Sequence, residues 1–104
     1  RMRAYEAMFI FRPDLNESEK TQLFDQLKDT LHKFNSKVKS ANIWAEKRTL
    51  HFNLAIKGSP TKFREGLYYL IEFESEPAEI GKVNALYRLN ENIMRFLISL
   101  QEEK

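Results

Sequence analysis

The chain has 104 residues, of which 42% are hydrophobic and 12% aromatic, and 17 Lys and Arg against 15 Asp and Glu give it a net charge of +2. This length predicts a single domain over residues 1–104, and the apolar content excludes disorder of the whole chain. The lack of cysteine excludes a disulfide framework and a thiolate zinc site, and no apolar run approaches the roughly 20 residues of a membrane span. No membrane partner is therefore expected, and without a secretory signal we expect the chain in the cytoplasm.

The first third of the chain predicts a strand followed by a helix. Residues 4–11 are rich in strand formers, and a proline shortly after them ends the strand. Asn16 and Glu19 then have the spacing of a capping box, in which each side chain accepts a hydrogen bond from the backbone N–H of the other residue. Because leucines and phenylalanines recur behind this box at helical spacing, a helix is predicted over residues 17–34.

Two strands are predicted in the middle of the chain. Residues 37–56 read as one long strand, and the alternation of apolar residues breaks around Trp44-Ala45-Glu46, where we expect a bulge or bend. A cluster of turn residues at 57–60 separates it from the next strand, which is predicted over residues 64–74.

The last third predicts a helix and a final strand. Glu76-Pro77 opens the helix, because proline fits the first helical turn. Residues 93–100 form the final strand, with Arg95 and Ser99 on one face. The other face of this strand is expected to carry Met94, Phe96, Ile98 and Leu100.

The predicted order is β-α-β-β-α-β, an α+β arrangement of two split β-α-β halves. It predicts a ferredoxin-like fold, a four-stranded antiparallel sheet with both helices on one face. The other face is then left to water, RNA or a protein, and we expect His51, Tyr69 and Arg95 to project from it. Because this architecture carries many unrelated functions, it assigns none by itself.

The small net charge conceals a basic segment. Residues 33–64 contain eight basic residues and a single acidic one, Glu46, which gives this segment a charge of +7. Such a segment is either a phosphate-binding surface or simply a well-solvated one, and composition alone does not separate the two.

No pattern in the sequence points to catalysis. The three glycines are isolated, so there is no phosphate-binding loop, and the serines lie in no nucleophile motif. His32 and His51 lack the spacing of a metal site. We therefore expect no enzyme activity, small-molecule substrate, metal or cofactor.

Basic residues and aromatic rings alternate from Trp44 to Tyr69, a combination that suits contacts with phosphates and with bases or riboses. For Phe52, Tyr68 and Phe73 a place in the core is the competing interpretation. The segment 64–73 also resembles, weakly, the octapeptide of the RNA-recognition motif. A free-standing module that binds single-stranded RNA is therefore the alternative function.

Four segments, 3–6, 47–54, 63–73 and 86–95, together resemble the bacterial small-subunit ribosomal protein six family along nearly the whole chain. The resemblance implies a structural, non-enzymatic ribosomal protein of the cytoplasm. It also implies binding to the central domain of 16S ribosomal RNA together with ribosomal protein eighteen. The chain departs from the family pattern at Glu46, where glycine is usual, and at His51, where a small residue is usual.

The resemblance also implies where RNA and protein would bind. RNA contacts are expected from Arg3, Lys47, Arg48, Arg88 and Arg95. On charge alone, Lys57, Lys62 and Arg64 are added to this set. Contacts with the protein partner are expected from Trp44, His51 and Tyr69.

Overall fold

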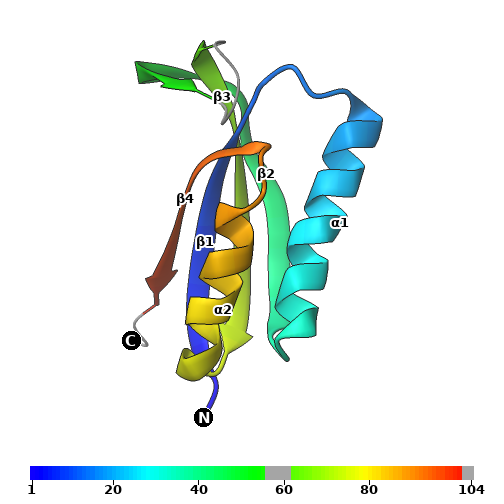
Figure 1. Cartoon of the computed structure of the whole chain (residues 1–104), viewed down its shortest axis with the longest axis vertical. Coiled ribbons are helices and arrows are strands. Elements are labelled where there is room, and N and C mark those ends of the chain that lie inside the picture. Colours follow the sequence, from blue (N-terminus) through cyan, green and yellow to red (C-terminus); the bar gives the residue numbers. More distant parts are fainter. Residues whose placement is uncertain (56–61, 102–104) are drawn as a thin grey trace.

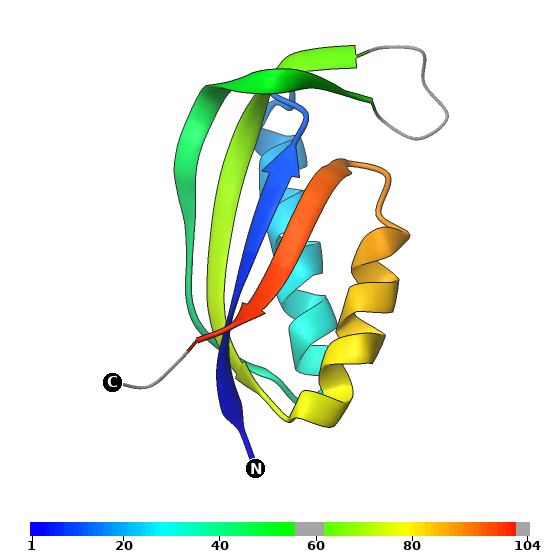
Figure 2. The ribbon, with the colours of Figure 1, turned by 90° about the vertical axis from the view of Figure 1, so that its left-hand side faces the viewer.

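The structure, a computed structural model, describes residues 1–55 and 62–101, with the side chains at 47, 48, 50–55 and 62–64 left undescribed. Its sheet has the strand order β2-β3-β1-β4, and all three neighbouring pairs are antiparallel. Both helices cover one face, as Figures 1 and 2 show, so the predicted ferredoxin-like architecture is confirmed. The elements are β1 (Arg3–Phe11), α1 (Glu17–Lys33), β2 (Lys37–Ala55), β3 (Lys62–Ser75), α2 (Pro77–Arg88) and β4 (Ile93–Leu100). Neither described helix is long and apolar enough to cross a membrane.

The two helices begin as the sequence predicts. The Asn16 side chain accepts a hydrogen bond of 2.8 Å from the Glu19 N–H, and the Glu19 carboxylate accepts one of 2.9 Å from the Asn16 N–H, which completes the capping box of α1. Pro77 occupies the first turn of α2, where a missing N–H costs no helical hydrogen bond. The helices are tied together because the buried Tyr87 hydroxyl donates to the Leu27 carbonyl at 2.7 Å.

The core lies between the helices and the inner face of β1 and β3. Phe9 contacts Tyr87 of α2 edge to face, with 5.0 Å between the ring centroids. Tyr69 stacks on Phe24 of α1 at 3.9 Å and is only 3% exposed. Among the described residues of the two central strands, each inward ring packs against another ring of the core. The inward residues are Tyr5, Ala7, Phe9 and Phe11 from β1 and Leu67, Tyr69, Ile71 and Phe73 from β3.

The predicted position of Tyr69 on the open face is wrong. In the register of the sheet Tyr69 lies beside Phe9, which faces the helices, whereas Tyr68 lies beside Ile10 and faces the other way. Tyr68 is therefore on the open face, and the competing interpretation, a core position for Tyr68, is wrong. For Phe73 the core position is confirmed.

The predicted phase of β4 is wrong at one residue. The register between β1 and β4 shifts between Ile10 and Phe11, so an extra residue is accommodated at Met94. Met94 consequently packs against Ile10 on the open face, as Tyr68 does, although Phe96 and Ile98 face the helices as expected.

Strand β2 is irregular where the sequence predicts it to be. Its register with β3 shifts between Ile43 and Ala45 and again between Ala45 and Arg48, which confirms the predicted bulge around Trp44. Beyond this point the far ends of β2 and β3 curve over the end of the sheet where α2 connects to β4 (Figures 1 and 2).

Candidate RNA and protein interface

The open face of the sheet carries a small group of apolar and aromatic side chains, which we name the aromatic corner: Ile10, Trp44, Tyr68 and Met94. Tyr68 and Met94 pack on Ile10, and the Trp44 ring meets the Tyr68 ring edge to face with 5.5 Å between the centroids. Trp44 remains 52% exposed. This contact lies at the β2 bulge, where the register shift brings Ala45 rather than Trp44 opposite Tyr68. The corner thus forms a partly exposed aromatic surface on the face that no helix covers.

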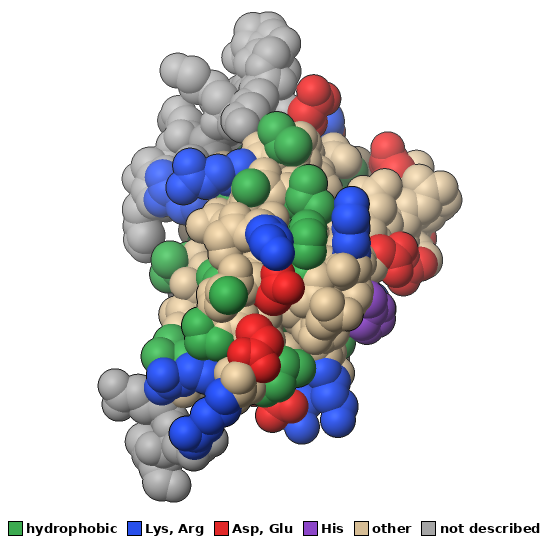
Figure 3. All heavy atoms as spheres, turned by 60° about the horizontal axis from the view of Figure 1, so that its bottom comes forward, with side chains coloured by type: hydrophobic (Ala, Val, Ile, Leu, Met, Phe, Trp, Pro, Cys, Tyr) green, Lys and Arg blue, Asp and Glu red, His purple; other side chains and the backbone are tan. Residues whose placement is uncertain are grey.

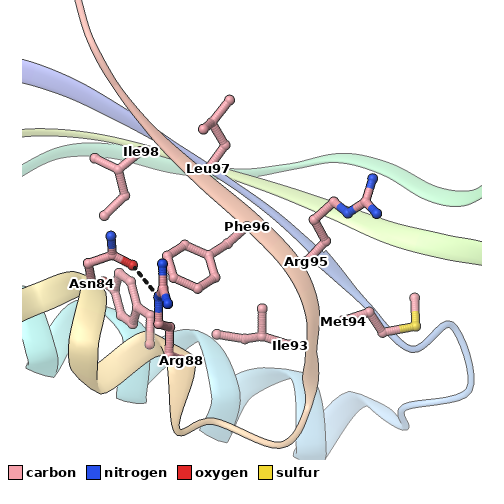
Figure 4. A pocket seen from close by; sticks show the side chains of 9 residues that line it. Asn84, Arg88, Ile93, Met94, Arg95, Phe96, Leu97 and Ile98 are labelled. Carbon is pink, nitrogen blue, oxygen red and sulfur yellow. Dashed lines mark hydrogen bonds between the residues drawn. The ribbon is translucent and has the colours of Figure 1, made fainter. Parts of the chain in front are cut away.

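Arg95 lies next to this corner, and Arg88 lies on the other side of β4 (Figure 4). Arg95 pairs with Ile10 in the register of the sheet and is exposed on the open face. Arg88 ends α2, and its Nε donates to the Asn84 side chain at 3.4 Å. Both arginines line a groove of about 380 Å³ between α2 and β4. Figure 4 shows Arg88 on the helix side of β4 together with Phe96, and Arg95 on the opposite side of the strand.

The sheet has a basic end and a mixed end. The basic end holds Arg95, Arg88 and the backbone of Arg48, which pairs with Gly66 just beyond the level of Leu67 and Phe11. Arg3 pairs with Ser75 at the other end of β1, so the structure separates it from these residues. Sequence reasoning placed all of these arginines in one RNA-binding set, and the fold divides the set between two ends.

Ion pairs neutralise much of the mixed end. Lys39 lies 3.9 Å from Glu74, and Lys82 lies 3.1 Å from Glu79. Figure 3 looks toward this end and shows acidic and basic side chains interspersed, without a field of one sign. A surface of this kind attracts polyanions less strongly than one on which cations predominate.

Two ion pairs shape the charge of the basic end. Arg12 donates to the Asp14 carboxylate at 2.7 Å from Nε and 3.1 Å from Nη2, and this hydrogen bonding lowers the pKa of Asp14. Glu46, the single acid of residues 33–64, lies 3.8 Å from the Nζ of Lys20 on α1. This ion pair joins β2 to α1 at the position where the family pattern has glycine.

Several expected site residues cannot be compared with the structure. Lys57 lies outside the described residues, and only the backbone is described for Lys47, His51, Lys62 and Arg64. Their proposed contacts remain predictions. Trp44 is the one expected partner residue whose side chain is described on the open face, and Tyr69 is withdrawn from this set because it is buried in the core.

Sequence reasoning did not place Tyr68, Ile10 and Met94 together on the open face. The sequence carried a partial signal for Tyr68: strand alternation puts Tyr68 and Tyr69 on opposite faces, although it does not show which face meets the helices. Met94 carried no such signal, since its orientation depends on a bulge that arises only when β4 pairs with β1. Within the described part of the chain, no three His, Cys, Asp or Glu side chains gather as metal ligands.

Comparison with known proteins agrees with this architecture. The family model for ribosomal protein S6 matches residues 4–99. The small ribosomal subunit protein bS6 of Synechocystis is 35% identical over 102 residues, covering 97% of this chain and 84% of the relative. The bS6 protein of Desulforamulus reducens is 29% identical over 102 residues, covering 98% of this chain and all of the relative.

The crystal structure of 30S ribosomal protein S6 from Thermotoga maritima has the same fold, with a TM-score of 0.80 and 24% identity over 97% of this chain and 89% of that one. Together with the match of the family model, this likeness confirms the predicted resemblance. The family model and the bS6 relatives establish a ribosomal, non-enzymatic role in the cytoplasm. The chain therefore belongs to the ribosomal protein S6 family, as a structural component of the small ribosomal subunit.

Proposed function

We propose that the chain binds the central domain of 16S ribosomal RNA together with ribosomal protein eighteen. The observation that carries this proposal is the position of Arg95 beside the aromatic corner, which puts a cation and an exposed apolar surface next to each other on the open face. One neighbourhood thus combines the chemistry that binds phosphate with the chemistry that binds a protein side chain.

The RNA side of the proposal rests on the basic end. Arg88 and Arg95 line one groove, and the part of the basic segment around Arg48 lies near the same end of the sheet. These cations would neutralise phosphates and fix the position of the protein on a folded RNA junction, with little reading of bases. The full set is Lys47, Arg48, Lys57, Lys62, Arg64, Arg88 and Arg95, with Arg3 a separate contact at the mixed end.

The protein side rests on the aromatic corner. Aromatic residues contribute a large share of the affinity at protein interfaces when they are buried by the partner. Trp44 is half exposed and already held in place by Tyr68, so little side-chain entropy would be lost when a partner covers it. His51 stays in the proposed partner set on sequence grounds.

A free-standing single-strand binder is not favoured. A module of the RNA-recognition type stacks bases on two or three aromatics of its central strands. Among the described residues of β1 and β3, Tyr68 is the only aromatic on the open face, and its neighbours Ile10 and Leu70 are aliphatic.

The experiment compares three equilibrium dissociation constants: for a central-domain RNA junction, for the same junction with protein eighteen present, and for an unstructured RNA hexamer. We expect the tightest binding to the junction with protein eighteen present and the weakest binding to the hexamer. If the hexamer binds as tightly as the junction with protein eighteen, the single-strand alternative is correct and the proposal fails.

A further inference from the structure

The two edges of the sheet are built differently. The β2 edge carries five charged residues in Lys37–Ala55 and is interrupted by four register shifts along β3. The β4 edge, Ile93–Leu100, carries one charged residue, Arg95, and no proline. Charges and bulges are the usual devices that stop a sheet edge from pairing with another chain. They protect β2 along its length, whereas the one register shift of β4 lies at Met94, near the start of the strand, and leaves the rest of that edge unprotected.

The hydrogen bonds between β4 and β1 show which backbone groups of β4 point away from the sheet. The Gln101 N–H donates to the Ala4 carbonyl at 2.9 Å, so Gln101 directs its polar groups toward β1. Because this direction alternates along an antiparallel strand, Phe96, Ile98 and Leu100 direct their N–H and C=O groups away from β1. No described strand lies beyond them (Figure 2), and Leu97 stands 68% exposed on the same edge strand.

We propose that this edge pairs with β4 of a second copy of the chain, antiparallel and about a two-fold axis at Ile98, so that two four-stranded sheets become one. In this register Phe96 lies opposite Leu100 of the second copy, and Ile98 lies opposite its own equivalent. All three outward residues of each copy then have hydrogen-bonding partners. A two-fold edge pairing is closed and self-complementary, so it ends at the dimer.

Side-chain chemistry favours this partner over another. Leu97 lies opposite Ser99 of the second copy and diagonal to Leu97 of the second copy. The pairing therefore covers Leu97, the most exposed apolar side chain of the strand. Arg95 lies opposite Gln101, whose chain continues into the acids Glu102 and Glu103. The antiparallel arrangement thus pairs the end of β4 that carries Arg95 with the end that precedes the acidic sequence Glu102-Glu103. The groove beside Arg95 is lined by two arginines and by no acid among the described residues.

The primary test is sedimentation equilibrium of the full chain across a concentration range from about 10 μM to about 1 mM, which suits an association of modest affinity. We expect a monomer–dimer equilibrium. Leu97→Lys should raise the dissociation constant about tenfold or more, because it removes an apolar side chain from the pairing and places two cations near the axis. Ile43→Lys, a matched change on the β2 edge, should leave it within about twofold.

A second variant tests the backbone contribution. The N–H of Leu100 faces outward, so Leu100→Pro removes a donor of the dimer without removing a β1 hydrogen bond, and we expect weaker dimerisation with the monomer still folded by circular dichroism. A monomer at every concentration overturns the proposal and leaves the edge for a different partner. A dimer that Ile43→Lys weakens more than Leu97→Lys overturns it as well.

Register is tested by disulfide trapping, which is clean because the native chain has no cysteine. Leu97 and Ser99 of the second copy form a pair whose Cα atoms lie close together, within disulfide reach. Mixing Leu97→Cys with Ser99→Cys should give the mixed disulfide in excess over either homodimer. A predominance of either homodimer contradicts the proposed register.

Discussion

Tyr68 and Tyr69 are neighbours in β3, yet they serve opposite faces of the sheet. Tyr69 is 3% exposed and stacks on Phe24 of α1, whereas Tyr68 supports Trp44 on the face that no helix covers. The inner face is closed by ring packing, and the open face offers an aromatic surface beside a cation. One residue step along a strand therefore separates a side chain that holds the fold together from one that is available to a partner.

The largest expected effect is on the inner face. Tyr69→Ala should lower the free energy of unfolding by about 3–5 kcal/mol, because it leaves a cavity between β3 and α1. Urea denaturation measures it, and Tyr68→Ala is the matched control. We expect the control to cost less than about 2 kcal/mol, since its ring is only partly buried. Equal losses for the two variants would contradict the division between the faces.

On the open face, the expected loss is in binding rather than in stability. Trp44→Ala should weaken the association with protein eighteen by about 2 kcal/mol, as for a central aromatic at an interface, and change the unfolding free energy by less than about 1 kcal/mol. Isothermal titration calorimetry and urea denaturation measure the two quantities. A variant that unfolds more readily but binds normally would place Trp44 in the fold and not in the interface.

At the basic end, the expected effect is a change in salt dependence. Replacing both Lys47 and Arg48 with alanine should reduce the slope of log K against log salt for the RNA junction by at most about two units, one for each phosphate that is no longer neutralised. Lys39→Ala paired with Lys82→Ala removes the same charge from the mixed end and should leave the slope nearly unchanged. An unchanged slope in the first variant would mean that those side chains only solvate the surface.

The smallest expected effect concerns the link between the helices. Burial raises the pKa of Tyr87 above its usual value, so the folded chain keeps the Tyr87 proton at a pH where the unfolded chain, with a tyrosine pKa near 10, loses it. The stability from this group is complete below about pH 10 and declines as the pH rises further. Tyr87→Phe should cost about 1 kcal/mol at neutral pH, because the Leu27 carbonyl loses its donor.

The pH dependence of the unfolding free energy separates the two effects of Tyr87→Phe, the lost hydrogen bond and the lost ionisable group. The variant lacks the ionisable hydroxyl, so the difference in unfolding free energy between it and the native chain should narrow above about pH 10. Thermal unfolding followed from about pH 8 to about pH 11 would reveal the narrowing. A constant difference over this range would show that the pKa of Tyr87 is the same in the folded and the unfolded chain.

Elements with a strong local signal could be predicted from the sequence. The capping box fixed the start of α1, Pro77 the start of α2, and the broken alternation the bulge at Trp44. The faces of the central strands could not be assigned as safely, because β3 is apolar in both phases and its alternation does not say which phase meets the helices.

Arg95 could be placed on the open face from strand alternation, and it is exposed there. Met94 could not, because its orientation follows from a register shift between strands that are distant in the sequence. The separation of Arg3 from Arg95 likewise depends on the antiparallel pairing of β1 with β4. In this pairing Arg95 lies opposite Ile10, near the C-terminal end of β1, whereas Arg3 is at the N-terminal end of β1.

RNA binding by the basic end is tested most directly by sedimentation of the chain with small ribosomal subunits that lack their own copy of this protein. We expect the chain to sediment with the subunits at low salt and to be released at high salt. Replacing both Arg88 and Arg95 with alanine should release the chain at lower salt, whereas the mixed-end variant with Lys39→Ala and Lys82→Ala should behave as the native chain does. Equal retention of the Arg88 and Arg95 variant at every salt concentration would contradict the central claim that the basic end binds ribosomal RNA.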